Sequence, residues 1–171
     1  LRRSRGLGDV YKRQAYYKPL LFKSVILGVS GKLGYVTGLG DKVTQSQRFN
    51  LGGRNIRGFG SGGIGPRDTG SSDAVGGNKM YAGSFEVVSN LGLDKDTGVR
   101  WTVFTDFGSL WGTDYPSGVT KPNAGQMRIS AGVGVFWSTA IGPLSFSWAK
   151  PLSKMAHDLE ETFRFNIGTR L

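Results

Sequence analysis

Hydrophobic and polar residues alternate along several stretches of this chain, the pattern expected of strands with two unlike faces. In residues 25–35 the odd positions are mostly apolar, whereas the even positions are mostly small or charged, as at Ser30 and Lys32. The same alternation recurs in five further stretches: residues 81–87, 99–108, 127–137, 144–148 and 163–168. Because these six stretches occur with almost no helical periodicity, we predict an all-β protein whose strands form an antiparallel meander.

The connections between the predicted strands alternate between long and short, from residues 36–80 at one extreme to residues 138–143 at the other. Outer-membrane β-barrels have long loops at one rim and short turns at the other, although a soluble β-sandwich also alternates. Charged residues on the polar faces favour the barrel, because a water-filled lumen would accept them; they are Lys32, Glu86, Arg100, Asp106, Arg128, Arg164 and Arg170. Aromatic residues near the strand ends of the other face would form its girdles: Tyr81, Trp101, Trp137, Trp148 and Phe163.

The composition narrows the class further. The 171 residues are enough for one domain, and the absence of cysteine excludes disulfides and thiolate metal sites. No run approaches 18 apolar residues, so a membrane-spanning helix is excluded. Since the smallest transmembrane barrels have about eight strands, we expect six strands to be only part of one.

The formal net charge of +10 is concentrated near the start, where residues 1–14 hold five of the 22 basic residues. Residues 4–14, SRGLGDVYKRQ, resemble a sequencing-library adapter translated in one frame. We therefore predict that residues 1–14 are a non-native, adapter-derived segment without native contacts, and that residues 15–171 are the barrel part. The alternative is a natural basic arm. Without a clustered basic face elsewhere, we expect no nucleic-acid partner.

The longest connection, residues 36–80, is rich in glycine. Gly58, Gly60 and Gly63 fit the G-x-G-x-x-G spacing, but the strand and helix that dinucleotide binding requires are not predicted around them. A solvated loop is the plain alternative. The loop nevertheless contains apolar residues that would then be exposed: Phe49, Leu51, Ile56, Phe59 and Ile64. We therefore expect it to fold back into the protein.

At these residues the chain resembles the BamA family of outer-membrane surface-antigen barrels. Ile56, Arg57, Gly58 and Phe59 match the family's (I/V)RGF tetrad. Other matching segments follow in family order: LGG, IGPRD, DAVGGN, TDFGSLW, IGPLSFSWAKP and FRFNIG. The resemblance implies the C-terminal six to seven strands of a sixteen-stranded transmembrane β-barrel, with residues 16–20 as the tail of strand ten. It also implies that the POTRA domains and the first nine strands are not in this sequence.

The resemblance further implies a function in the outer membrane of a Gram-negative bacterium. The family inserts β-barrels, so unfolded outer-membrane proteins would be the substrates, with assembly-complex lipoproteins and outer-membrane lipid as partners. We expect no enzyme activity and no cofactor. The alternative is a secretion transporter or channel of the same superfamily, and a soluble carbohydrate-active β-sandwich is a remote third.

In the family the tetrad arginine meets acidic residues of the inner barrel wall. Glu86 and Asp106 both have the inward parity, so they are the expected partners of Arg57. Arginine suits this role because its guanidinium presents a planar fork of donors to carboxylates. Two solvated carboxylates without a partner are the alternative interpretation.

The last predicted strand would form the family's lateral gate, a seam at which a substrate strand pairs. Its residues are Phe163, Phe165, Ile167, Gly168 and Leu171. Gly168 has no side chain to pack, so we expect weak pairing beyond it and an inward bend. The chain ends at Leu171, whereas the family usually ends with an aromatic residue.

Other chemistry has little support in the sequence. A carboxylate pair could serve a glycosidase, but Arg57 would neutralise it. The single histidine, His157, lies in a polar stretch and is expected to be an exposed loop residue. One histidine without cysteine does not predict a metal site.

Overall fold

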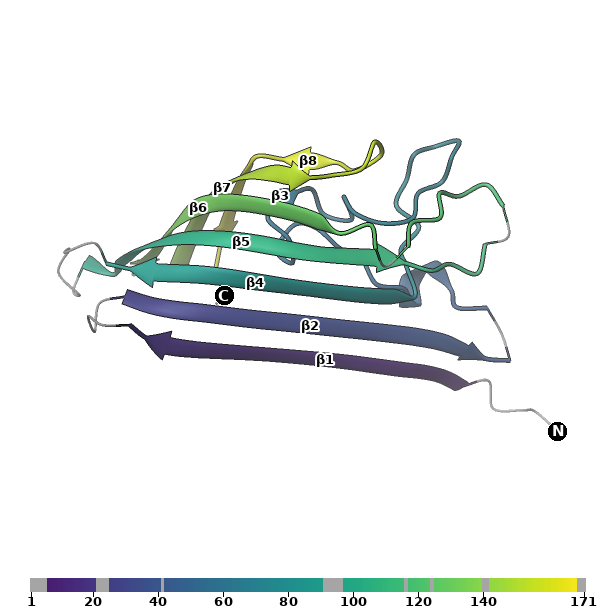
Figure 1. The fold of residues 1–171 in the computed structure, drawn as a ribbon, viewed down its shortest axis with the longest axis horizontal. Coiled ribbons are helices and arrows are strands. Elements are labelled where there is room, and N and C mark those ends of the chain that lie inside the picture. The colour runs from purple at the N-terminus through teal and green to yellow at the C-terminus, as the bar shows by residue number, and fades with distance from the viewer. Residues whose placement is uncertain are drawn as a thin grey trace.

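The computed structural model describes residues 6–20, 25–40, 42–90, 97–115, 117–123, 125–139 and 142–168. Seven strands form one antiparallel sheet in the order β1-β2-β4-β5-β6-β7-β9 (Figure 1). They are β1 Gly6–Pro19, β2 Val25–Leu39, β4 Lys79–Ser89, β5 Val99–Trp111, β6 Arg128–Thr139, β7 Gly142–Ser153 and β9 Phe163–Ile167. A second sheet pairs β3 Gly58–Phe59 with β8 Glu160–Glu161, and one short helix, η1, spans Gln45–Gln47.

All six predicted strands are present, and the antiparallel meander is confirmed. Most strands extend further than predicted toward the long connections, so the longest connection occupies residues 40–78 rather than 36–80. Within the described ranges, no helix is long and apolar enough to cross a membrane.

The strand register places the polar positions of neighbouring strands on one face. Ser30 of β2 lies opposite Ser84 of β4, Ser84 lies opposite Asp106 of β5, and Asp106 lies opposite Ser130 of β6. Directly opposite residues share a face of the sheet, so these four side chains form a row across four strands. This polar face is the inner face, against which the long loop folds.

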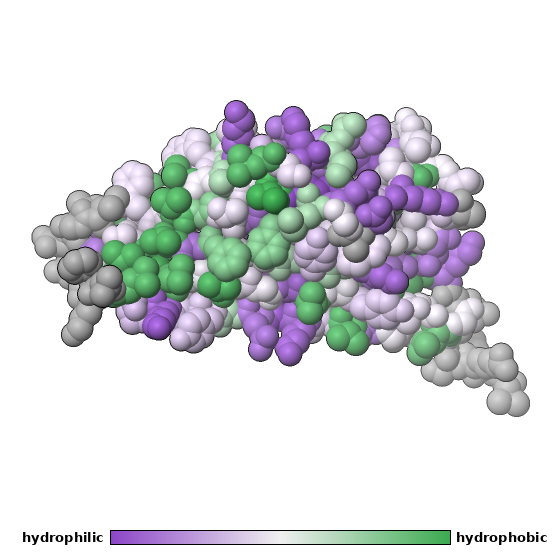
Figure 2. All heavy atoms as spheres, in the orientation of Figure 1, coloured by the Kyte–Doolittle hydropathy of each residue, from purple (hydrophilic) through white to green (hydrophobic). Residues whose placement is uncertain are grey.

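The opposite face is the outer face, and it exposes large apolar side chains. They include Leu33, Phe85, Trp101, Val103, Val133, Trp137, Trp148, Phe163 and Phe165. Figure 2 shows hydrophobic residues gathered over the left and middle of the sheet, with hydrophilic residues toward the right, where the long connections lie. Phe146 and Phe165 stack at 4.9 Å between ring centroids across β7 and β9. An apolar band with aromatic residues suits a lipid-facing surface.

The hydrophobic core lies between the long loop and the inner face of the sheet. The loop contributes Leu51, Ile56, Phe59 and Ile64, and the sheet contributes Met80, Ala82 and Leu110. Phe49 packs against this cluster. The expectation that the loop folds back into the protein is therefore met. Its apolar residues are buried because they pack against the sheet instead of facing water.

The beginning of the chain differs from its prediction. Residues 6–14 belong to β1, which pairs with β2 along its whole length, so the expectation that they make no native contacts is wrong. An extended segment beside β2 satisfies the backbone groups that an open edge would leave unpaired. The outer face of β1 nevertheless carries exposed Lys12 and Gln14, beside Leu33 and Gly31 of β2. The adapter origin of residues 1–14 stays a prediction, and residues 1–5 lie outside the described ranges.

Candidate functional site

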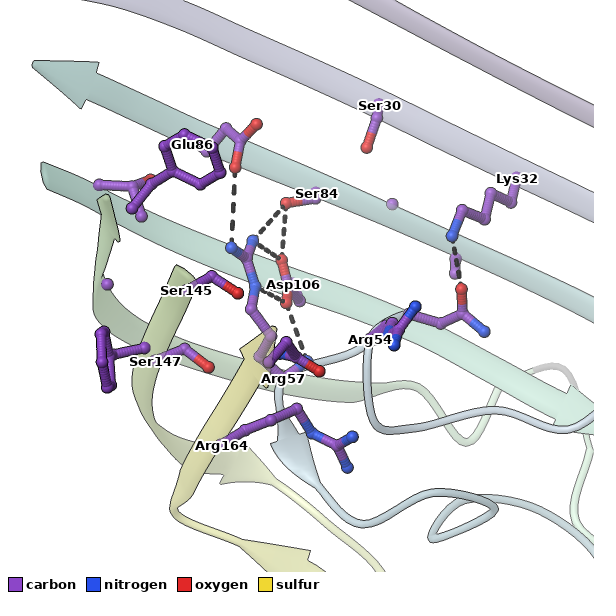
Figure 3. A pocket seen from close by; sticks show the side chains of 18 of the residues that line it. Ser30, Lys32, Arg54, Arg57, Ser84, Glu86, Asp106, Ser145, Ser147 and Arg164 are labelled. Atoms are coloured by element: carbon purple, nitrogen blue, oxygen red, sulfur yellow. Dashed lines mark hydrogen bonds and ion pairs between the residues drawn. The ribbon is translucent and has the colours of Figure 1, made fainter. Parts of the chain in front are cut away.

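Arg57 extends from the long loop to the inner face of the sheet, where it meets both predicted carboxylates (Figure 3). Its Nε donates to Asp106 Oδ2 at 2.7 Å, and its Nη2 donates to Asp106 Oδ1 at 2.8 Å. The backbone N–H of Arg57 also donates to Asp106 Oδ2, at 2.9 Å. The guanidinium therefore binds one carboxylate as a fork, the geometry for which arginine is suited.

Asp106 is fully satisfied by these contacts. Ser84 Oγ donates to Asp106 Oδ1 at 2.6 Å, so each carboxylate oxygen accepts two hydrogen bonds. A carboxylate has about four such acceptor sites, and all of them are used. Because the Asp106 side chain is only 2% exposed, loss of these donors would leave a buried charge without compensation.

Three further groups surround Arg57. Its Nη1 lies 3.7 Å from Glu86 Oε2, a longer ion pair than that with Asp106. Its Cζ lies 3.3 Å from the ring centroid of Phe104, a cation–π contact. Its backbone carbonyl accepts a hydrogen bond from Ser130 Oγ. Arg57 thus connects the loop to β4, β5 and β6, and both predicted carboxylates face a cation rather than water alone.

The other tetrad residues fit the wall closely. Ile56 and Phe59 are fully buried, and a Cβ on Gly108 of β5 would lie 2.7 Å from Ile56 Cδ1. Gly58 has φ +90°, and a Cβ there would lie 3.2 Å from Ser130 Cβ and 3.3 Å from Ala149 Cβ. Only glycine adopts this backbone conformation without strain, and there is little room for a side chain. We call Arg57, Asp106, Glu86, Ser84 and Ser130 the wall anchor.

Lys32 adds a second contact between the loop and the inner face. Its Nζ donates to Asn55 Oδ1, which lies two residues before Arg57. Lys32 belongs to β2, so the loop is bonded to four neighbouring strands of the sheet.

The loop also contacts the connection between β7 and β9. Gly58 and Phe59 pair with Glu161 and Glu160 as β3 and β8. Backbone hydrogen bonds join Gly60 N to Leu159 O at 2.9 Å and Leu159 N to Gly63 O at 3.0 Å. From β9, Arg164 Nη2 donates to Glu161 Oε2 and to Ser61 Oγ. We call these contacts the connection latch.

The same connection is fixed from the other side by an arginine fork. Arg128 Nε and Nη2 donate to Asp158 Oδ2 and Oδ1 at 2.9 and 3.0 Å, and both side chains are almost fully buried. Strand alternation predicted only that Arg128 and Arg164 point inward, and it did not identify their acidic partners. His157, next to Asp158, is exposed, in agreement with its prediction.

The seam residues lie at one edge of the large sheet. β9 pairs with β7 over five residue pairs, from Trp148 opposite Phe163 to Leu144 opposite Ile167. Phe163, Phe165 and Ile167 are exposed on the outer face. The chain turns at Gly168, whose φ is +72°. Leu171 and any bend after Gly168 lie outside the described ranges.

A cavity of about 440 Å³ lies between the sheet and the loop. Its lining includes four cationic residues besides Arg57: Arg13, Lys32, Arg54 and Arg164. Among the described residues, no cluster of three or more His, Asp or Glu side chains could hold a metal ion.

An outer turn of the loop is organised by Asp68. Its Oδ1 accepts the backbone N–H groups of Gly70 and Ser71, each at 2.8 Å. These hydrogen bonds, that from Ser71 first, favour the ionised form and hold the pKa of Asp68 below its usual value. Asp68 lies nine residues after Phe59, and its side chain bonds the backbone of this turn rather than the wall anchor.

The Omp85 superfamily domain matches residues 9–171, so the match begins inside the segment predicted to be non-native. The outer membrane protein assembly factor BamA of Neisseria meningitidis is 31% identical over 182 residues, covering 91% of this chain and 23% of that protein. BamA of Neorickettsia risticii is 32% identical over 146 residues, covering 85% of this chain and 19% of that protein. The chain thus spans about a quarter or less of these relatives.

A solved structure agrees with these relatives. The crystal structure of BamA from Haemophilus ducreyi lacking POTRA domains 1–3 has a TM-score of 0.82 and 33% identity, covering 93% of this chain and 34% of that one. The predicted resemblance and the outer-membrane location in a Gram-negative bacterium are confirmed. The chain belongs to the Omp85 superfamily, as part of an outer-membrane β-barrel similar to that of BamA.

Proposed function

We propose that this chain is part of an outer-membrane protein assembly factor that inserts other β-barrels through a lateral strand seam at β9. The observation that carries this proposal is the contrast between the two edges of β7. Within the described residues, eleven residue pairs join β7 to β6, whereas five join it to β9. Because a longer antiparallel ladder contains more hydrogen-bonded pairs, β9 is held much less firmly than the strands inside the sheet.

The short β9 strand suits reversible pairing. An edge strand presents unpaired backbone donors and acceptors to which an incoming strand can add. The positive φ of Gly168 ends the regular strand after five residues, which limits how much pairing must be broken. Unfolded outer-membrane proteins rich in amphipathic strands are the substrates that such an edge would accept.

The wall anchor supports the same function from inside the barrel. The loop that carries Arg57 fills part of the inner space and is bonded to β2, β4, β5 and β6, so strands away from the seam are held firmly while the seam itself is weakly paired. Strand addition needs hydrogen bonds and no covalent step. The proposed mechanism therefore requires no catalytic residue and no cofactor.

The superfamily alternative, a transporter or channel, is favoured by the cavity of about 440 Å³ with its cationic lining. In that function the substrate would pass through the lumen, and the long loop would act as a plug. The loop contacts that hold the wall anchor would then have to break during each passage. The names of the curated relatives support assembly instead.

A disulfide lock tests the seam. One cysteine would be introduced in β9, at Phe165, and the other in the first barrel strand of the full-length protein. This chain has no cysteine, so no native thiol of its own would interfere. We expect the oxidised protein to lose insertion of a substrate barrel into liposomes and to regain it on reduction.

The matched control locks two strands that are already fully paired. Phe136 of β6 lies opposite Ser145 of β7, so cysteines there can form a disulfide without moving the seam. This variant should insert substrate equally well when oxidised or reduced. Full activity with the seam locked would exclude the seam mechanism and favour transport through the lumen.

A further inference from the structure

Arg164 is the side chain through which the seam strand touches the inner loop. It belongs to β9, has the inward parity, and donates to Glu161 of β8 and to Ser61 of the loop. Figure 3 shows it reaching from the last strand toward the segment that carries Arg57. Its neighbours on β9, Phe163 and Phe165, are exposed on the outer face, where their rings pack against Trp148 and Phe146 of β7.

Among the residues that the structure describes, the latch contacts lie at the start of β9. At its start, the connection is bonded to the loop through β3, Gly60 and Gly63, and to β6 through Arg128 and Asp158. The backbone of Ala149 donates to Thr162 O at 2.9 Å, so the sheet edge and the latch meet just before Phe163. At the other end, the backbone N–H of Gly168 donates to Pro143 O at 2.8 Å.

We propose that Arg164 is a positioning residue that couples the inner loop to the seam: through Glu161 and Ser61 it fixes the start of β9, so that the anchoring of the loop sets how firmly β9 pairs with β7. The seam would then loosen first near Ile167. The importance of this coupling for activity rests on the proposed function of the seam. The coupling itself does not depend on that function.

The coupling has a physical route. The wall anchor holds the loop at Arg57, and the next residues, Gly58 and Phe59, form β3 and pair with β8. Only Thr162 separates β8 from β9. A movement of the loop away from Asp106 would therefore pull on the start of β9 within a few residues of the released bond.

Amide hydrogen exchange in the full-length protein tests the proposal, because it reports the opening of β9 without any substrate. Arg164→Gln removes the charge and shortens the side chain but keeps it polar. We expect amides of residues 163–167 to exchange about fivefold faster, equivalent to about 1 kcal/mol, while β4 and β5 keep their protection. Arg164→Lys, which retains the charge, should recover part of the protection.

Two other variants separate coupling from local packing. Asp106→Asn removes the wall anchor without touching β9, and it should also speed exchange of residues 163–167. Arg100→Gln is the matched control, because Arg100 lies on the inner face of β5 and its side chain makes no ion pair within the described ranges. It should leave β9 unchanged.

Unchanged exchange in β9 after Arg164→Gln, or a rise confined to the loop after Asp106→Asn, would overturn the proposal. An equal rise over the whole sheet after Arg164→Gln would also overturn it, because that result indicates general destabilisation. None of these outcomes bears on the seam mechanism, which the disulfide lock tests separately through insertion of substrate.

Discussion

Two of the places that hold the long loop, the wall anchor and the connection latch, differ in burial and in the number of bonds. At the wall anchor, Arg57 binds a carboxylate that is 2% exposed and accepts four hydrogen bonds. At the connection latch, Arg164 binds Glu161, whose side chain is 35% exposed. Removing one partner of a buried pair costs about 3–5 kcal/mol, whereas an exposed pair contributes about 0.2–1 kcal/mol.

The difference indicates separate tasks for the two contacts. The wall anchor fixes the loop against strands that remain paired, so its bonds are buried and fully satisfied. The latch lies beside the strand that we propose to open, where a strong bond would prevent the opening. A weak, partly exposed ion pair can break and re-form at little cost.

The largest expected effect comes from Arg57→Ala. It leaves the buried Asp106 without its fork and should destabilise the folded protein by about 3–5 kcal/mol, or less where lumen water reaches the site. Urea unfolding and protease cleavage of the loop in the full-length protein would measure this. Arg100→Ala serves as the control. An equal loss of stability in the two variants would contradict a particular contribution of Arg57 to the fold.

Gly58→Ala should have the next largest effect. The residue has φ +90°, and its Cβ would press on Ser130 and Ala149, so we expect a cost of about 1–3 kcal/mol. Gly31→Ala is the matched control, because a Cβ at Gly31 meets no atom within 4 Å. Thermal unfolding of both variants compares them directly, and equal melting temperatures would contradict the close fit of the tetrad.

Glu86→Gln should cost less than loss of Asp106. The Glu86 carboxylate lies 3.7 Å from Arg57 and makes no fork, so we expect about 1 kcal/mol or less. Comparison with Asp106→Asn under the same urea unfolding conditions ranks the two carboxylates. A larger loss of stability for Glu86→Gln than for Asp106→Asn would contradict the assignment of Asp106 as the main partner of Arg57.

Glu161→Gln should have the smallest effect on global stability, about 0.2–1 kcal/mol, because the pair with Arg164 is partly solvated. The loss should also fall as salt is added, since exposed ion pairs are screened. Unfolding measured at low and high ionic strength tests this. A loss that is large and independent of salt would mean that the latch is a second strong anchor.

Much of this arrangement follows from local sequence patterns. Period-two alternation predicted each of the six strands, because one side of every strand faces apolar surroundings and the other side polar ones. The same parity puts Glu86 and Asp106 on one face, and the tetrad puts Arg57 in the loop. The structure brings these three residues together.

The latch could not be predicted in this way. Arg128 and Asp158 are 30 residues apart, and Arg164 and Ser61 are 103 apart, so no local spacing relates them. β3 and β8 have two residues each, too few to show an alternating pattern. The pairing of residues 6–14 with β2 was also missed, because the resemblance of residues 4–14 to a translated adapter excluded them from the strand pattern.

The most direct test of the contrast between the two contacts is a pair of double-mutant cycles in the full-length protein. One cycle combines Arg57→Ala with Asp106→Asn, and the other combines Arg164→Gln with Glu161→Gln. The coupling energy from urea unfolding should be larger for the wall anchor by about 2 kcal/mol or more, given the difference in burial. Equal coupling energies, or a larger value at the latch, would contradict the assignment of a strong anchor and a weak latch.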